Sequence, residues 1–352
     1  MASKIKLKIL IGAKSDEYQS CLTIGDFVYT YINRKKYDVS TIRVSKDGEQ
    51  WLFPTDPGAM LPMELSHATP GSYVTLTLGA AIDRLKDEKP DVVFLASPGG
   101  TGEDGSFQGL MQAANLKYTS SGVLGSALAM DKQKSSELYQ YYGLKTPKTI
   151  AVSRKDLTEI EKVKKSVAEK IGFPCFVKPN SSGSSVGIGR VKTQEDLEAA
   201  LAQALKKSPI ALAQENIKGR ELTCGILDDG IHEPMPLTPT ETILLRGEIF
   251  SYEDKHVHKD SVEELNPAPV SDAMTKKIQA AALTAHTALR CAGLSRTDMM
   301  LTEKDELIVL ETNTIPGMTP GSVYLKIIGN FGMTIQDFFD RIISSAFTRE
   351  LE

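Results

Sequence analysis

The stretch from Phe176 to Val191 constrains the fold more than any other part of this chain. It reads FVKPNSSGSSVGIGRV: an apolar strand ends in Lys178, passes through a loop of serines and glycines, and resumes as a second strand. Small residues let the backbone approach a ligand closely, and successive N–H groups in such a turn form an anion-binding concavity. An ordinary Ser/Gly-rich hairpin would have the same pattern. The stretch therefore predicts a phosphate-binding loop or a plain hairpin, and other segments must decide between them.

Strands and helices alternate in the first third of the chain, which is typical of a doubly wound parallel sheet. The apolar patterns predict strands at Ile5–Gly12, Tyr37–Val44 and Asp91–Ala96, and helices at about Ser20–Asn33 and Thr77–Lys86. The stretch from Asp47 to Ser72 is expected to be an insertion or a long surface loop. Its Trp51, the only tryptophan, is interpreted as a packing residue.

A GxGxxG pattern follows the third predicted strand at Gly100, Gly102 and Gly105. In a dinucleotide-binding fold the next helix N-terminus would hold a pyrophosphate, but Glu103 and Asp104 would repel it there. We interpret the segment as a glycine-rich turn that carries a carboxylate pair.

The remaining chain predicts a small α+β module around the serine–glycine loop and a larger α+β part after it. The predicted helices are about Ala129–Tyr142, Leu157–Lys170, Thr193–Lys207 and Ser271–Cys291, and the predicted strands are Lys145–Val152, Ile210–Asn216, Glu221–Leu227 and Glu241–Leu245. His256 and His258 lie in a polar segment and form an isolated pair, which is more typical of solvated loop histidines than of metal ligands.

Two further strands, Leu294–Leu301 and Leu307–Asn313, predict a hairpin that carries a metal site. Strand periodicity places Arg296 and Asp298 on one face of the first strand, and Glu311 and Asn313 on one face of the second. In the simplest register these side chains converge, and such hard oxygen ligands suit Mg²⁺ that carries phosphate oxygens. A solvent-facing polar stripe is the alternative, but the apolar neighbours favour burial, and a buried carboxylate needs a cation.

Length and composition limit the domain number of the protein and the kinds of partner that it can bind. The 352 residues predict two or three domains, and the net charge of -4 provides no basic field for nucleic acid or an anionic membrane. The sequence has no apolar run long enough for a membrane span and no cleavable apolar segment at its start, so we expect a cytoplasmic protein. Its four cysteines contain no CxxC pair, which argues against a disulfide framework or a structural zinc site.

A glycine loop, lysines and an acid–amide cluster together indicate phosphoryl transfer from ATP with Mg²⁺. The chain lacks the GxxxxGK[ST] loop and the protein kinase motifs. The turn from Thr314 to Ser322 offers backbone N–H groups and a hydroxyl for a substrate carboxylate. If a carboxylate accepts the phosphoryl group, the product is an acyl phosphate that an amine can attack.

In order and spacing these motifs resemble the D-alanine–D-alanine ligases of the ATP-grasp superfamily, from the first strand to about Ile343. The matching segments are Gly102–Gly105 with Gln108 and Gly109, Met130–Lys132, Lys178–Pro179 with Gly183–Gly187, Gly219–Glu221, Arg296–Asp298, and Glu311–Thr319.

The resemblance implies a fold of an N-terminal α/β domain (residues 1–122), a central subdomain (123–213) and a C-terminal subdomain (214–352), with ATP between the last two. It implies ATP-dependent joining of two D-alanines through an acyl phosphate, for cell-wall precursor synthesis, in a homodimer. The alternatives are a ligase with a different second substrate, such as a D-alanyl–hydroxy acid ligase or another amino-acid ligase, and a non-catalytic nucleotide-binding regulatory protein.

The resemblance also implies roles for individual residues. For ATP, it assigns Lys132, Lys178 and Ser185 to the phosphate side, backbone contacts of Glu215 and Ile217 to adenine, and Glu221 to the ribose. Asp298, Glu311 and Asn313 would hold two Mg²⁺ ions, with Mn²⁺ as a possible substitute. Arg296 and the backbone at Gly317 would stabilise the tetrahedral intermediate, and Ser322 would bind the second substrate's carboxylate. Lys255 would reach the γ-phosphate from a loop spanning about Ser251 to Pro267, whose closure keeps water out.

Three positions depart from the family pattern. The first-loop glutamate that binds the first substrate's ammonium falls at Asp16, or at Glu17 with one insertion. The tyrosine that completes a hydrogen-bonded triad with the loop serine, here Ser184, is replaced by His256. The histidine before the glycine-rich turn is Pro98. These changes lie where the amino-acid substrates are expected, so ATP use follows more directly from the resemblance than the second substrate does. A histidine at position 256 could also make the choice between an amine and a hydroxyl acceptor depend on pH.

Overall fold

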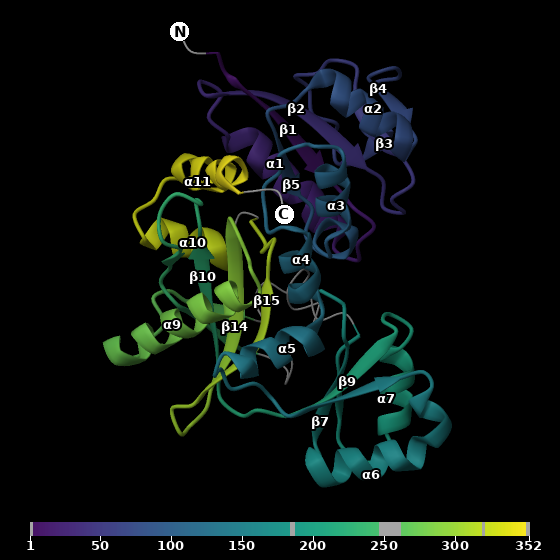
Figure 1. The fold of residues 1–352 in the computed structure, drawn as a ribbon, viewed down its shortest axis with the longest axis vertical. Helices are drawn as coiled ribbons and strands as arrows, with labels where there is room; N and C mark the ends of the chain where they lie inside the picture. The colour runs from purple at the N-terminus through teal and green to yellow at the C-terminus, as the bar shows by residue number, and fades with distance from the viewer. Residues whose placement is uncertain (1–2, 184–186, 246–261, 319–320, 350–352) are drawn as a thin grey trace.

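The computed structural model describes residues 3–183, 187–245, 262–318 and 321–349 (Figure 1). The described chain folds around separate β-sheets in its N-terminal, central and C-terminal parts. Among these residues, every helix is too short or too polar to cross a bilayer.

The N-terminal sheet confirms the predicted parallel strands. Its strand order is β4-β3-β2-β1-β5, and β1 pairs in parallel with both β2 and β5. Its elements are β1 (Ile5–Ile11), α1 (Tyr18–Tyr31), β2 (Tyr37–Val44), β3 (Trp51–Pro54), β4 (Tyr73–Leu76), α2 (Leu78–Glu88), β5 (Val92–Ala96) and α3 (Ser106–Ala113).

The prediction of a long loop between Asp47 and Ser72 is wrong in part, because β3 lies within it and pairs antiparallel with β2 and β4. Trp51 on β3 is buried, and its ring lies 5.6 Å from that of Phe107, as a packing residue should. The four-residue strand is too short to show a period-two pattern.

The last helices return to the N-terminal part. They are α10 (Val323–Asn330) and α11 (Ile335–Thr348), and α11 lies beside α1 in Figure 1. Phe339 of α11 packs against Phe27 and Phe94, with ring centroids 6.0 and 5.9 Å apart. Asp340 accepts a hydrogen bond of 2.8 Å from the Tyr37 hydroxyl. The N-terminal sheet therefore completes its core with residues from the other end of the chain.

The central sheet contains the serine–glycine stretch. Its strands are β6 (Thr149–Ser153), β7 (Cys175–Pro179), β8 (Gly189–Val191) and β9 (Ile210–Glu215), in the antiparallel order β6-β9-β7-β8. Helices α6 (Ile160–Lys170) and α7 (Leu197–Ala204) supply apolar side chains to the same core. Cys175 pairs with Val191 and Val177 with Gly189, so the predicted strand–loop–strand arrangement is confirmed.

The C-terminal sheet has the order β13-β12-β10-β14-β15, with β11 paired to β10. Its strands are β10 (Arg220–Leu227), β11 (Met235–Pro236), β12 (Thr240–Leu244), β13 (Val262–Leu265), β14 (Leu294–Leu301) and β15 (Leu307–Asn313). Helix α9 (Asp272–Ala288) packs on β10 and β14, and the Ser271 hydroxyl caps its first turn by accepting from the Met274 N–H at 3.2 Å. Helices α4 (Val123–Met130) and α5 (Lys132–Tyr141) connect the N-terminal and central parts.

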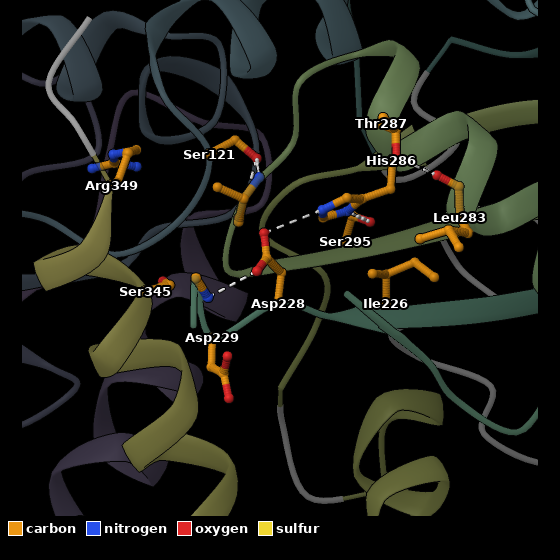
Figure 2. Close-up of polar contacts among 12 residues, drawn as sticks. Ser121, Ile226, Asp228, Asp229, Leu283, His286, Thr287, Ser295, Ser345 and Arg349 are labelled. Carbon is orange, nitrogen blue, oxygen red and sulfur yellow. Dashed lines mark hydrogen bonds and ion pairs between the residues drawn. The ribbon is translucent and has the colours of Figure 1, made fainter. Parts of the chain in front are cut away.

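A buried polar chain joins α9 to this sheet (Figure 2). His286 Nδ1 lies 2.8 Å from the Ser295 hydroxyl, and its Nε2 lies 3.6 Å from Asp228 Oδ2. These are the residue types of a hydrolase triad, but Ser295 is completely buried, so a substrate has no access to its hydroxyl. We interpret the chain as a structural connection.

Candidate active site

The acid–amide cluster forms because β15 contains an irregularity. Asp298 lies opposite Glu311 and Arg296 opposite Asn313, whereas Met299 lies opposite Val309. Leu310 is therefore an extra residue on β15. Uninterrupted pairing from Leu301 and Leu307 would turn Glu311 and Asn313 to the other face of the sheet, so the predicted convergence occurs but not in the simplest register.

Polar donors surround the Asp298 carboxylate. Arg296 Nε and Nη2 donate to its two oxygens at 2.9 and 2.8 Å, the Thr223 hydroxyl donates at 2.7 Å, and Asn313 Nδ2 donates at 3.3 Å. Burial lowers the pKa of Arg296, but the neighbouring Asp298 carboxylate outweighs it and raises this pKa above its usual value. A cation that binds Asp298 must displace at least one of these donors.

The donor set at this face fits Mg²⁺. Two carboxylates and one amide oxygen are hard ligands, and they leave positions for water and phosphate oxygens. Asp298 and Glu311 are partly shielded, with side-chain exposures of 14% and 28%. Their opposition across β14 and β15 places both carboxylates at one point of the sheet.

Two lysines connect this cluster with the serine–glycine loop. Lys132 Nζ lies 3.2 Å from Glu311 Oε2 and donates to the Ser182 carbonyl at 2.7 Å. Lys178 is buried at the end of β7, and burial lowers its pKa to about 8, against the opposing effect of Glu311. The loop is tied to α5 because the Asn180 side chain accepts from the Gln133 N–H at 2.8 Å. The structure thus brings both cations beside the predicted metal ligands.

The residues expected around adenosine lie on β9, β10 and the loop between them. Thr223 lies opposite Asp298, and Glu221 lies opposite Met300. Glu221, two residues before Thr223 on β10, therefore lies on the same face of the sheet as the acid–amide cluster. Glu215 ends β9, and its carboxylate accepts from the Lys148 N–H at 2.7 Å. Ile217 is half-buried in the following loop.

The structure distinguishes Asp16 from Glu17 in the first loop. Asp16 forms an ion pair of 3.0 Å with Lys207 of the central part. Glu17 instead extends toward Gly99 and Gly183, and a Cβ atom at Gly183 would clash with its Oε1. Both residues border a cavity of about 590 Å³ between the first loop and the serine–glycine loop. Glu17 is therefore the carboxylate that faces the serine–glycine loop.

The turn after β15 is held by a residue that the sequence analysis did not select. Glu103 is buried, and its Oε1 accepts from the N–H groups of Thr314 and Ile315, both at 2.8 Å. Its Oε2 accepts from the Gly99 N–H at 2.8 Å. Burial raises the pKa of Glu103, and the three backbone donors oppose this. The sequence showed Glu103 as a charge that excludes a pyrophosphate, and it did not show this role because two of its three partners, Thr314 and Ile315, lie more than 200 residues away.

The other end of this turn leaves a hydroxyl for a ligand. Ser322 is the N-cap residue of α10, and its Oγ is buried without a hydrogen-bond partner among the described residues. A buried hydroxyl normally has a hydrogen-bond partner, and Ser322, unlike Ser295, is only half-buried as a residue, so a carboxylate that enters beside it could supply this partner. Along the chain, Gly317 lies between Ile315, whose N–H binds Glu103, and Ser322.

Four predicted site residues, Ser184, Ser185, Lys255 and His256, lie outside the described residues. Pro98, at the family's histidine position, accepts a hydrogen bond from the Ser15 hydroxyl at 3.1 Å through its carbonyl.

Two protein-family models together match both halves of the chain. The family model described as D-ala D-ala ligase N-terminus matches residues 6–121, and the one described as D-ala D-ala ligase C-terminus matches residues 138–344. The D-alanine–D-alanine ligase of Shouchella clausii is 34% identical over 361 residues, which cover 99% of this chain and 96% of the relative. D-alanine–D-alanine ligase A of Escherichia coli K12 is 32% identical over 362 residues, which cover 98% and 96%.

Two solved ligase structures share this fold over 98% of the chain. VanG D-Ala:D-Ser ligase from Enterococcus faecalis superposes with a TM-score of 0.80 at 28% identity, over 98% of this chain and 100% of that one. The D-alanine–D-alanine ligase from Coxiella burnetii gives a TM-score of 0.79 at 26% identity, over 98% and 94%.

Proposed function

The chain belongs to the D-alanine–D-alanine ligase family, and we propose that it joins two D-alanines at the expense of ATP. The predicted family and the ATP-grasp fold of an α/β domain and two α+β parts are confirmed. One observation carries the proposal: Asp298, Glu311 and Asn313 meet on one face of β14 and β15, and Lys132 bridges from Glu311 to the serine–glycine loop.

The ATP half of the reaction uses the lysines and the acid–amide cluster. Asp298, Glu311 and Asn313 would hold two Mg²⁺ ions, and the ions would neutralise charge on the transferred phosphoryl group. Lys132 and Lys178 would bind the phosphates beside Ser185, with Lys255 at the γ-phosphate. Glu215, Ile217 and Glu221 would bind adenine and ribose.

The amino-acid half uses the first loop and the turn after β15. Glu17 would bind the ammonium of the first D-alanine, whose carboxylate oxygen attacks the γ-phosphorus while ADP leaves. The amine of the second D-alanine then attacks the acyl carbon, loses a proton, and expels phosphate. Arg296 and the Gly317 N–H would stabilise the negative oxygen of the tetrahedral intermediate, and Ser322 would bind the second carboxylate.

The proposal also covers the domain organisation of the chain, its oligomeric state and its location in the cell. Residues 1–122, 123–213 and 214–352 would act as N-terminal, central and C-terminal domains in a cytoplasmic homodimer that makes cell-wall precursors. The partners are small amino acids, without nucleic acid or membrane.

A second candidate differs in the acceptor. VanG, a D-Ala:D-Ser ligase, has the same fold over the whole chain, and Pro98 and His256 depart from the family pattern at substrate positions. If the second substrate is a hydroxy acid or another amino acid, the proposed roles of the ATP-binding and metal-binding residues stay the same.

Phosphate release separates these candidates. The protein is given ATP and Mg²⁺ with D-alanine alone, with D-alanine plus D-serine or D-lactate, and with a panel of other D- and L-amino acids, and the products are identified by mass. Turnover with D-alanine alone and D-Ala–D-Ala as product supports the proposal. Turnover only with a mixed pair supports the second candidate, and no turnover with any pair contradicts both.

A further inference from the structure

Glu103 connects two distant segments through one buried carboxylate. It belongs to the glycine-rich turn after β5, and it accepts three backbone hydrogen bonds of 2.8 Å, from Gly99, Thr314 and Ile315. Charge-assisted hydrogen bonds of this kind are stronger and better defined in direction than neutral ones. The N-terminal part therefore fixes the position of the start of the turn after β15.

The rest of this turn is anchored on the same side. Ile315 and Met318 are buried in the core that contains the strands of the N-terminal sheet. The Ser120 hydroxyl also lies 3.4 Å from the Thr314 carbonyl oxygen. Since Gly317 lies two residues beyond Ile315, any shift of Thr314 and Ile315 moves the Gly317 N–H as well.

The phosphate-binding groups depend on other elements. Lys178 lies on β7, Lys132 begins α5, and Glu221 lies on β10. Among the described residues, the backbone hydrogen bonds of the Glu103 carboxylate come from Gly99, Thr314 and Ile315. A change at Glu103 thus acts directly on the turn that serves the amino-acid half of the site, and it reaches the phosphate side only through Asn313, which precedes Thr314.

We propose that Glu103 is a positioning residue for the amino-acid half of the reaction. It holds the N–H groups of Thr314 and Ile315 so that the turn presents Gly317 to the reacting carbonyl and Ser322 to the acceptor carboxylate. Both carboxylate oxygens of Glu103 accept from backbone N–H groups, so Glu103 acts through the turn. The inference rests on the proposed ligase function.

Glu103→Gln tests the proposal with a side chain of the same shape. The amide keeps one acceptor oxygen, but its NH₂ group must face either Gly99 or the pair Thr314 and Ile315, which are all donors. We expect kcat to fall by about 10- to 100-fold, the scale of a misplacement of about 1 Å. The KM for the acceptor D-alanine should rise, and the KM for ATP should stay within about twofold.

Asp91→Asn is the matched control, because its carboxylate also accepts from a backbone N–H, that of Lys6 at 2.7 Å, but lies away from the cavity beside Glu17. Its kinetic constants should match those of the parent protein. Hydrogen exchange gives a second measurement: the amides of Thr314 and Ile315 should exchange at least about tenfold faster in Glu103→Gln, while those of β1 and β7 keep their rates.

Several outcomes would overturn the inference. They are an unchanged kcat in Glu103→Gln, an equal rise in the KM for ATP and in the KM for D-alanine, or unchanged exchange rates at Thr314 and Ile315. If Glu103→Gln does not fold, Glu103→Asp, which keeps the charge but withdraws it by one methylene, must show the same exchange pattern. Absence of ligation in the parent protein would refute the proposed function instead, and the exchange result would still decide the link.

Discussion

Lys178 makes ATP binding depend on pH. Burial lowers its pKa to about 8 in the free protein, with partial opposition from Glu311, and a bound triphosphate favours the charged ammonium and raises that pKa. Below about pH 8 the lysine is charged with or without ATP, so pH has no effect through this group. Above about pH 8, binding must take up a proton, and ATP affinity should fall as pH rises. Calorimetry at pH 9 in two buffers with different ionisation enthalpies measures the uptake.

The control is Lys178→Arg, whose guanidinium stays protonated in this pH range. Its binding should lack the proton uptake assigned to Lys178. The same uptake in parent and variant would show that another group titrates.

Glu311 is the residue whose loss should be most damaging. Glu311→Ala removes one of two carboxylates from the acid–amide cluster and leaves Lys132 without its ion-pair partner at 3.2 Å. We expect ATP turnover to fall by at least about 10³-fold while circular dichroism stays unchanged, because Glu311 is partly exposed and fills no core position. Glu306→Ala, on the turn of the same hairpin and paired with Lys145, should keep full activity. An active Glu311→Ala protein would refute the metal assignment.

The two carboxylates of the first loop should behave differently. Glu17→Gln removes the charge that faces Gly99 and Gly183, so the KM for the first D-alanine should rise by about tenfold or more, as for a lost charge-assisted contact. Asp16→Asn breaks only an exposed ion pair with Lys207 and should change the KM by less than about threefold. Initial-rate kinetics with D-alanine as the varied substrate measure both. A larger effect of Asp16→Asn would reverse the assignment.

At the scale of the element, the pairing register of β14 and β15 decides which side chains meet at the site. Deleting Leu310 should restore continuous pairing and still leave Glu311 opposite Asp298 and Asn313 opposite Arg296, so metal-dependent turnover should persist. Asp305→Gly, in the turn of the same hairpin, should leave activity intact because Asp305 already has a positive φ of 57°. Metal-dependent ATP turnover and a thermal melt check both variants. A folded Leu310 deletion without turnover would show that the bend at the bulge, and not the pairing register alone, positions the cluster.

Sequence reasoning found these elements but not their irregularities. Alternation along Leu294–Leu301 and Leu307–Asn313 predicted the strands and the convergence of the polar side chains. It did not reveal the extra residue, because a bulge is defined by pairing with a partner strand and not by either strand alone. Glu103 was missed for the same reason, since its role depends on Thr314 and Ile315, which are distant in sequence.

At the scale of the molecule, the end of the chain completes the N-terminal core. Phe339 is buried between Phe27 and Phe94, so Phe339→Ala should lower the free energy of unfolding by about 3–5 kcal/mol. Phe347→Ala is the control, because Phe347 is 38% exposed and should cost far less. Equal effects on denaturant midpoints would mean that α11 is not part of this core.

The sequence predicted the parallel N-terminal strands, the serine–glycine hairpin and the order of the motifs. The return of α11 to the first sheet was not predicted, because the pattern of a helix shows which face is apolar but not which surface covers it. The family resemblance supplied the residue roles, and the fold shows which of those residues lie together.

The most direct test of the account follows an oxygen atom from D-alanine. The protein is incubated with ATP, Mg²⁺ and D-alanine whose carboxylate carries oxygen-18, and the released phosphate is analysed by mass or by phosphorus NMR. Activation through an acyl phosphate predicts one labelled oxygen in each phosphate for each D-Ala–D-Ala formed. Dipeptide formation with unlabelled phosphate would contradict the account, because the carboxylate oxygen would then not have attacked the γ-phosphorus.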